Sequence, residues 1–270
     1  MTDTTTTDLN SIDLNSDLGE SYGRWVLGDD AALFGLVSSA NIACGFHAGD
    51  PSVMQRSIRL ALENDVAIGA HPGYADLRGF GRVGLELPAE QLRNDIVYQL
   101  GALAGLCRVE GATLRYVKPH GALYNQMNRD EAVARTVVAA VAAFDPALPL
   151  LVLAASGAER VVRDYGHPYR REAFIDRGYL PNGQLQPRSE PGSVTTDPVA
   201  AADRALRLVQ TGEVSATDGT TLQLRPDSLC VHGDTPGARQ LVGLVRQRLT
   251  DAGVKVRPCW DTPRPGESTP

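Results

Sequence analysis

Four of the five histidines in this sequence stand shortly after apolar runs, close to acidic, amide and lysine residues. These four are His47, His71, His120 and His232, and His167 is the exception. Imidazoles transfer protons near neutral pH and bind transition metal ions. Burying several imidazoles beside carboxylates is costly unless a ligand, a metal or a proton transfer uses them. The pattern therefore favours a catalytic or metal-binding site.

Further polar residues stand in or after the same apolar runs. They are Asn15, Asp17, Asn41, Lys118, Asp176 and Arg177. Lys118 is notable because the chain has only one other lysine, Lys255, among 26 lysines and arginines. Cys44 and Cys230 are interpreted as small buried apolar residues, and Asp50 as the cap of a helix that begins at Pro51.

The elements that must position these residues are short strands alternating with longer helical segments. Strands are predicted at residues 11–14, 40–44, 67–70, 114–117, 150–154, 172–175 and 229–231, with 254–257 as a candidate eighth. This alternation indicates an α/β fold. Parallel strands joined by helices place their carboxyl ends on one face, where barrel and open-sheet enzymes hold their active sites. Most of the polar residues named above follow a strand, so we expect them to converge there.

No linker rich in proline, glycine or serine divides the chain, so one domain is expected over residues 11–257. A disordered tail is expected at 1–10 and a loose, proline-rich segment at 258–270. The connections at 72–87 and 176–196 are long for a compact domain, which is typical of functional loops.

The composition limits the function classes. The 270 residues are 43% hydrophobic, which is enough for a globular core. The net charge of −6, with no basic stripe, argues against nucleic acid and membranes as partners. No apolar stretch reaches the roughly 18 residues of a membrane span and the amino terminus lacks a secretory pattern, so a cytoplasmic location is expected. The four cysteines lie far apart, which disfavours a disulfide scaffold.

Common catalytic motifs are absent from the sequence. It has no GxxxxGK, no GxGxxG directly after a strand, no GxSxG and no HExxH. These absences exclude a recognisable P-loop, dinucleotide fingerprint, hydrolase serine elbow and metalloprotease helix.

Several segments resemble the LamB/YcsF family, to which the A subunit of the ATP-dependent 5-oxoprolinase belongs. They span nearly the whole chain in the family's order: IDLNSDLGE (12–20), SSANIACGFHAGDP (38–51), AIGAHPGYADLRGFGR (67–82), VKPHGALYN (117–125), FIDRGY (174–179), PRS (187–189) and CVHGD (230–234). Two positions depart from the family pattern. Ile175 stands where alanine is usual and Val83 where a second arginine is frequent, which bears on substrate preference and not on membership.

The resemblance implies a single-domain (β/α) barrel with about seven parallel strands, related in shape to glycoside hydrolases and polysaccharide deacetylases. It also implies a reaction in which 5-oxo-L-proline is opened to L-glutamate while ATP is hydrolysed to ADP and phosphate. ATP is then a co-substrate, and the 5-oxoprolinase subunits B and C are the expected partners. The sequence leaves open whether a divalent metal is bound.

Site residues follow from the resemblance together with the strand-end pattern. The expected catalytic residues are His47, His71, Lys118, His120, Asp176 and His232. The expected substrate-binding residues are Asn15, Asp17, Asn41, Arg82, Tyr124 and Arg177. His71 or His120 is expected to act as general base on water, with Lys118 binding a carboxylate or phosphate oxygen. The candidate metal ligands are Asp13, His47 and His71.

Two other functions stay open at this stage. A stand-alone, metal-dependent amidohydrolase or deacetylase would hold a divalent ion and act without ATP. A non-catalytic protein would bind 5-oxoproline and deliver it to catalytic partners. Several histidines and carboxylates at one site favour a catalytic role within the complex.

Overall fold

Seven parallel strands form a closed barrel in the computed structural model, which describes residues 11–232 and 237–260. The strands are β1 (Ser11–Leu18), β2 (Ser39–Ala43), β3 (Ala67–His71), β4 (Leu114–Val117), β5 (Leu150–Leu153), β6 (Tyr169–Phe174) and β9 (Ser228–Cys230). Each pairs with the next, and β9 pairs with both β6 and β1, which closes the sheet. The expected α/β barrel with seven parallel strands is confirmed.

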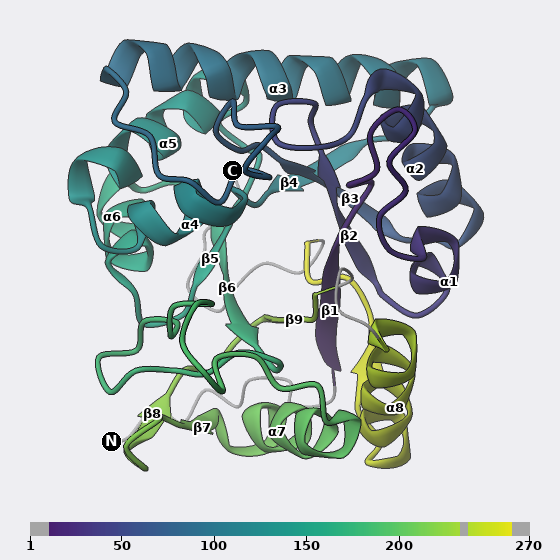
Figure 1. Cartoon of the computed structure of the whole chain (residues 1–270), viewed down its shortest axis with the longest axis vertical. Coiled ribbons are helices and arrows are strands. Elements are labelled where there is room, and N and C mark those ends of the chain that lie inside the picture. Colours follow the sequence, from purple (N-terminus) through teal and green to yellow (C-terminus); the bar gives the residue numbers. More distant parts are fainter. Residues whose placement is uncertain (1–10, 233–236, 261–270) are drawn as a thin grey trace.

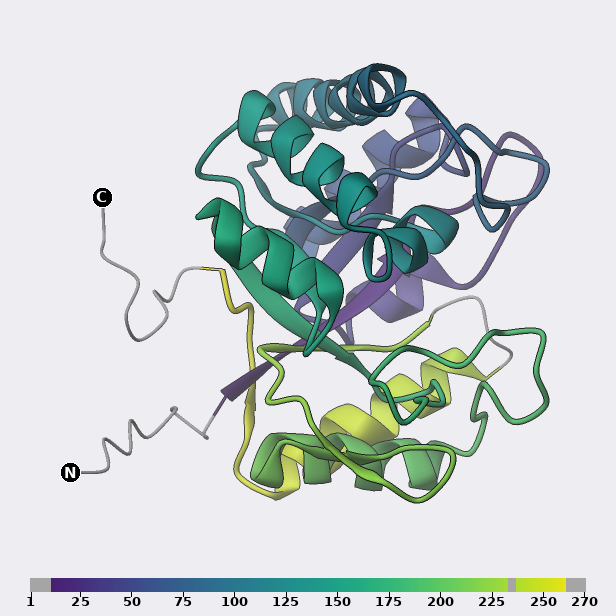
Figure 2. The ribbon, with the colours of Figure 1, turned by 90° about the vertical axis from the view of Figure 1, so that its left-hand side faces the viewer.

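Helices surround the strands (Figures 1 and 2). They are α1 (Asp30–Phe34), α2 (Pro51–Glu63), α3 (Ala89–Glu110), α4 (Gly121–Met127), α5 (Glu131–Phe144), α6 (Gly157–Tyr165), α7 (Pro198–Thr211) and α8 (Ala238–Asp251). Asp50 caps α2 as predicted, because its side chain accepts from the N–H groups of Ser52 and Val53. None of the described helices has the length and apolar character needed to span a bilayer.

The strands differ from the sequence-based prediction in three respects. The candidate eighth strand is β10 (Lys255–Val256), which pairs in parallel with the first residues of β1 and takes no part in closing the barrel. A hairpin of β7 (Glu213–Ser215) and β8 (Thr221–Gln223) was not predicted, because its strands are short and largely exposed. β1 continues to Leu18, four residues beyond its predicted end.

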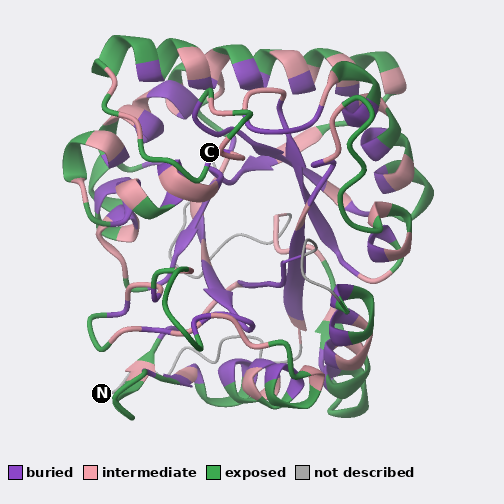
Figure 3. Ribbon diagram, viewed as in Figure 1, coloured by how far each residue is buried: buried purple, intermediate pink, exposed green. Residues whose placement is uncertain are grey.

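The barrel interior is polar, whereas the apolar core lies between the strands and the helices. Alternate residues of a strand face opposite sides of the sheet. On β1, Asp13, Asn15 and Asp17 make hydrogen bonds across the interior, while Leu14 and Leu18 belong to the apolar core. Figure 3 shows the buried strands and the buried inner faces of the helices.

The amino ends of the strands are covered by the last described residues. The indole of Trp260 stacks on the ring of Tyr116, with 3.8 Å between centroids and 5° between planes. Its Nε1 donates to Ser39 Oγ at 2.8 Å. The segment 258–270, expected to be loose, is thus described as far as Trp260, and residues 1–10 and 261–270 lie outside the described residues.

Candidate active site

A cavity of about 380 Å³ lies at the carboxyl ends of the strands. This volume is within the range of small-molecule sites. Eight of the residues expected from the sequence line it, namely Asp17, His71, Arg82, Lys118, His120, Tyr124, Arg177 and His232. The structure therefore brings most of the strand-end residues to one place.

Lys118 lies at the centre of the buried charges. Its Nζ is 3.0 Å from Asp17 Oδ1 and 3.0 Å from Glu172 Oε1. It also donates to Cys230 Sγ at 3.1 Å. Burial lowers the pKa of the ammonium, but the two carboxylates and the sulfur outweigh burial and hold the pKa well above its ordinary value. Lys118 is therefore a fixed cation in the barrel.

Asp17 is held as a carboxylate at the cavity wall. Burial raises its pKa, but His71 and Lys118 outweigh burial, so that the pKa lies well below its ordinary value. Two expected residues lie beneath it and do not line the cavity. Asn41 Nδ2 donates to Asp17 Oδ1 and to Asn15 Oδ1, both at 2.8 Å. Asn15 and Asn41 thus support Asp17.

His232 and Asp176 form a separate pair. Nδ1 of His232 lies 2.7 Å from Asp176 Oδ2, which also accepts from the His232 backbone N–H at 3.2 Å. Burial raises the pKa of Asp176, but His232 outweighs burial and the pKa falls below its ordinary value. The ionised carboxylate accepts from Nδ1–H, which leaves Nε2 for proton transfer. A carboxylate that orients an imidazole in this way is a recurring general-base arrangement.

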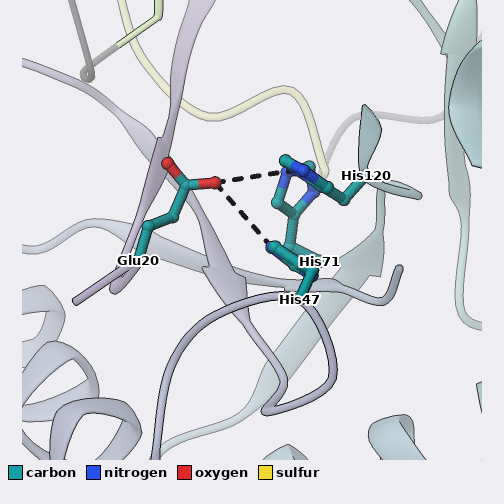
Figure 4. A group of neighbouring side chains, drawn as sticks. All are labelled: Glu20, His47, His71 and His120. Carbon is teal, nitrogen blue, oxygen red and sulfur yellow. Dashed lines mark hydrogen bonds and ion pairs between the residues drawn. The ribbon is translucent and has the colours of Figure 1, made fainter. Parts of the chain in front are cut away.

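A histidine–glutamate cluster, made of Glu20, His47, His71 and His120, lies beside the cavity. One ligand atom from each residue can be chosen so that all four lie within 4.8 Å of one another, and all four residues are buried. Glu20 Oε1 lies 3.6 Å from His120 Nδ1 and 3.8 Å from His47 Nε2 (Figure 4). The rings of His47 and His120 stack at 3.8 Å. Burial lowers the pKa of His47 and His120 well below the ordinary value, so both rings are neutral at pH 7.

The loop after β3 covers this cluster. Phe80, at φ +56°, has a conformation that residues other than glycine rarely adopt, and its carbonyl accepts from His120 Nε2 at 2.8 Å. A Cβ on Gly73 would lie 2.7 Å from His47 Nδ1, and a Cβ on Gly81 would lie 2.7 Å from both His47 and His120. Glycine is therefore required for the backbone to approach these rings.

The structure does not bring Asp13, one of the candidate metal ligands, to the histidines. Its carboxylate accepts from the hydroxyls of Ser38, Ser39 and Ser228 near the amino ends of the strands. Burial raises its pKa to about 6. His167 lies outside the cavity, as expected, with Nε2 bonded to the Leu148 carbonyl.

Arg177, an expected substrate-binding residue, holds the long loop after β6. Its Nη2 donates to the Gln186 carbonyl at 2.6 Å, and its Nε donates to the Ser193 carbonyl at 3.3 Å. The loop in turn supplies cavity-lining residues, including Gln186 and Arg188. Arg177 therefore shapes the cavity through the backbone of this loop.

The site includes residues that were not predicted as site residues, among them Glu20, Glu172, Cys230 and the cavity-lining Arg129 and Arg188. Glu20 ends the segment IDLNSDLGE but has no predicted role, and Cys230 is predicted to be a small buried apolar residue. Glu172 lies within β6, where its carboxylate meets Lys118 and accepts from Tyr124 Oη at 2.8 Å. Inspection of strand ends alone misses Glu172, because it lies within a strand. The alternation of inward-facing residues along β6 would have indicated it.

Known proteins resemble this chain over most of its length. The model of the LamB/YcsF family matches residues 12–263. A protein from Paracidovorax citrulli, named as the A subunit of 5-oxoprolinase, is 51% identical over 92% of this chain and 98% of its own length. A protein of the same name from Pyrococcus furiosus is 47% identical over 93% of this chain and 98% of its own length. The crystal structure of a lactam utilization protein from Thermus thermophilus superposes with a TM-score of 0.87 at 50% identity, covering 92% of this chain and 99% of that chain.

Proposed function

Because this chain belongs to the LamB/YcsF family, we propose that it is the A subunit of a 5-oxoprolinase, an enzyme that opens the lactam of 5-oxo-L-proline to L-glutamate with hydrolysis of ATP. The identity of about half the residues to proteins of that name, over nearly their whole length, supports this function. The observation that carries it is the small cavity in which fixed cations, a carboxylate and an oriented imidazole meet.

The chemistry of a lactam explains the need for ATP. A five-membered lactam is a stable amide, and its nitrogen is a poor leaving group. Transfer of the γ-phosphoryl group of ATP to the lactam oxygen releases ADP and makes the ring carbon electrophilic. Water then adds to that carbon, and cleavage of the C–N bond with protonation of nitrogen gives an acyl phosphate. A second water molecule releases phosphate and leaves glutamate.

We assign proton transfer in ring opening to His232. Asp176 fixes its Nδ1–H, so that Nε2 can take a proton from the attacking water and return one to the ring nitrogen. His71 and His120, the bases expected from the sequence, instead direct a nitrogen at each other, with 3.0 Å between His71 Nε2 and His120 Nδ1. Asp17 lines the cavity and would orient the water.

Positive side chains would hold the anionic parts of the activated lactam. Arg82, Arg129 and Arg188 line the cavity together with Lys118. A bidentate guanidinium suits a carboxylate or a phosphoryl group. Each well-placed donor contributes roughly 3 kcal/mol when it meets charge that develops in the transition state.

The phosphoryl transfer itself is assigned to the partner subunits B and C, because this sequence has no P-loop. In this division, the present chain opens the ring after activation. Use of ATP fits the cytoplasmic location expected from the sequence.

Glutamate release from 5-oxo-L-proline and ATP tests this function, with the chain assayed alone and then mixed with subunits B and C. Activity is expected only in the mixture. ATP-independent activity of the chain alone would contradict the proposal in favour of a metal-dependent amidohydrolase. A chain that changes only the affinity of its partners for 5-oxoproline would be a binding protein without catalytic function.

His232→Gln tests the assignment of the base. The variant is expected to lower turnover of the complex by about 10²- to 10⁴-fold, because general-base catalysis is lost. His167→Gln is the matched control and is expected to keep turnover, since His167 lies outside the cavity. Unchanged turnover in His232→Gln would overturn the assignment.

A further inference from the structure

Two imidazoles of the histidine–glutamate cluster have tautomers that the backbone fixes. His71 Nδ1 lies 2.7 Å from the carbonyl oxygen of Lys118, and His120 Nε2 lies 2.8 Å from that of Phe80. A carbonyl oxygen only accepts hydrogen bonds, so both of these nitrogens carry hydrogen. The nitrogens that stay available for another partner are then His71 Nε2 and His120 Nδ1.

These two nitrogens lie 3.0 Å apart. Without a proton or a cation between them, the lone pairs of the two nitrogens repel each other, and the low dielectric of a buried site increases this repulsion. A metal cation between the two nitrogens would accept a lone pair from each. Two metal–nitrogen bonds would then replace the repulsion. Metal-binding imidazoles in proteins commonly donate their other N–H to a carbonyl or carboxylate, as His71 and His120 do.

His47 gives independent evidence for a ligand at this cluster. Its side chain is fully buried, and neither ring nitrogen has a hydrogen-bond partner among the described residues. A buried polar atom without a partner costs about 1–3 kcal/mol, so this arrangement calls for a ligand. The ring stacks on that of His120, and its Nε2 lies 3.8 Å from Glu20 Oε1.

The spacing of the ligand atoms suits a tetrahedral ion. Bonds of about 2.0–2.1 Å from zinc to nitrogen and oxygen place neighbouring ligand atoms roughly 3.3 Å apart in a tetrahedron. Of the six separations between the four ligand atoms, all lie within 4.8 Å, and three bracket the tetrahedral value. They are 3.0 Å between His71 and His120, 3.6 Å between His120 and Glu20, and 3.8 Å between His47 and Glu20.

We propose that the histidine–glutamate cluster binds a single divalent transition metal ion of the zinc type. Three imidazole nitrogens and one carboxylate oxygen form a donor set that suits Zn²⁺ and related ions, whereas Mg²⁺ and Ca²⁺ prefer oxygen ligands only. Glu20 supplies one negative charge, and Asp17 adds a second at 3.4 Å from His71 Nε2. Glu20, His71 and His120 also line the cavity, so the ion would lie at its wall. This inference concerns binding and does not depend on the proposed reaction.

Metal binding by the full-length chain tests the proposal. The chain is freed of metal with a chelator and titrated with ZnCl₂ in a calorimeter, and with CoCl₂ while visible absorption is recorded. We expect one ion per chain and the intense Co²⁺ absorption of a four-coordinate site. His47→Gln and Glu20→Gln are each expected to weaken metal binding by roughly 100-fold or more, because each variant loses a direct ligand. Loss of a group that only orients a ligand already lowers metal affinity by about 10- to 100-fold.

His167→Gln is the matched control, because His167 is a buried histidine outside the cluster. It is expected to bind both ions as the unchanged chain does. Circular dichroism verifies folding, and the two independent ligand variants keep the test decisive if one of them does not fold. Absence of stoichiometric binding, or equal affinity in the ligand variants, would overturn the site. A proton shared by His71 and His120 would then account for their contact.

Discussion

Asp13 is a buried carboxyl group whose protonation couples stability to pH. It is fully buried, and burial raises its pKa from 3.8 to about 6 despite hydrogen bonds from Ser228, Ser38 and Ser39. Unfolded Asp13 releases its proton near pH 4, whereas folded Asp13 keeps it until about pH 6. Between these values the folded chain binds more protons than the unfolded chain. The contribution of Asp13 to the free energy of unfolding therefore falls as pH rises, by about 3 kcal/mol over this window.

Asp13→Asn is expected to remove this pH dependence. Chemical denaturation at pH 4 to 7 measures the free energy of unfolding of both chains. The unchanged chain is expected to lose stability relative to the variant from pH 4 to 6, with a constant difference above pH 7. A constant offset across the whole range would contradict the raised pKa, because it would reflect lost hydrogen bonds alone.

At the scale of elements, the loop after β6 depends on one guanidinium. Arg177 is buried and donates to the carbonyls of Gln186 and Ser193. Burial, together with the charge of Arg188, lowers the pKa of Arg177 to about 10, so it stays charged at neutral pH. Arg177→Ala removes both hydrogen bonds from a charged donor, each of which contributes about 1.5–3 kcal/mol. The loop is therefore expected to open more often.

Limited trypsin digestion measures this opening, because Arg188 lies within the loop. Cleavage after Arg188 is expected to accelerate about tenfold or more in Arg177→Ala, since cleavage follows the open population. The exposed Arg207 on α7 offers a control, and Arg207→Ala is expected to leave the rate unchanged. Equal cleavage rates in Arg177→Ala and the unchanged chain would show that Arg177 does not hold the loop.

The strand pattern predicted the barrel strands well where they are apolar. Every residue of a strand such as β5 is buried, so its apolar residues form an unbroken run in the sequence. β1 was predicted too short because Asn15 and Asp17 resemble loop residues, yet they face a polar barrel interior. The β7–β8 hairpin has no apolar run and gave no strand pattern.

The sequence predicted that the site lies at the carboxyl ends of the strands. It did not predict how the site residues divide into separate groups. Strand ends located His71, Lys118 and His232, because parallel strands share one direction. The sequence does not divide the four histidines into a cluster of three and a pair with Asp176, since this division depends on packing between distant segments. Glu20 reaches the cluster only because the chain bends after β1 at Gly19, with φ +70°.

At the scale of the whole molecule, the two ends of the barrel have different roles. The cavity occupies the carboxyl ends, and the stacked rings of Trp260 and Tyr116 lie toward the amino ends. In β/α barrels, residues at the carboxyl-end face serve catalysis, whereas those at the opposite face serve stability. The two ends should therefore respond differently to substitution.

Trp260→Ala tests this separation. Truncation of a fully buried large aromatic residue costs about 3–5 kcal/mol, and the partly buried Trp260 is expected to cost about 1–3 kcal/mol. Turnover in the complex with subunits B and C is expected to stay within about twofold at 25 °C, because the ring is remote from the cavity. The other tryptophan, Trp25, is 67% exposed, and Trp25→Ala is expected to change stability by less than about 0.5 kcal/mol. Loss of turnover in Trp260→Ala at unchanged stability would contradict this separation, because it would mean that the amino end of the barrel also shapes the site. The connection would run through the polar interior, where hydrogen bonds join Ser39 and Asp13 to Asn15 and Asp17.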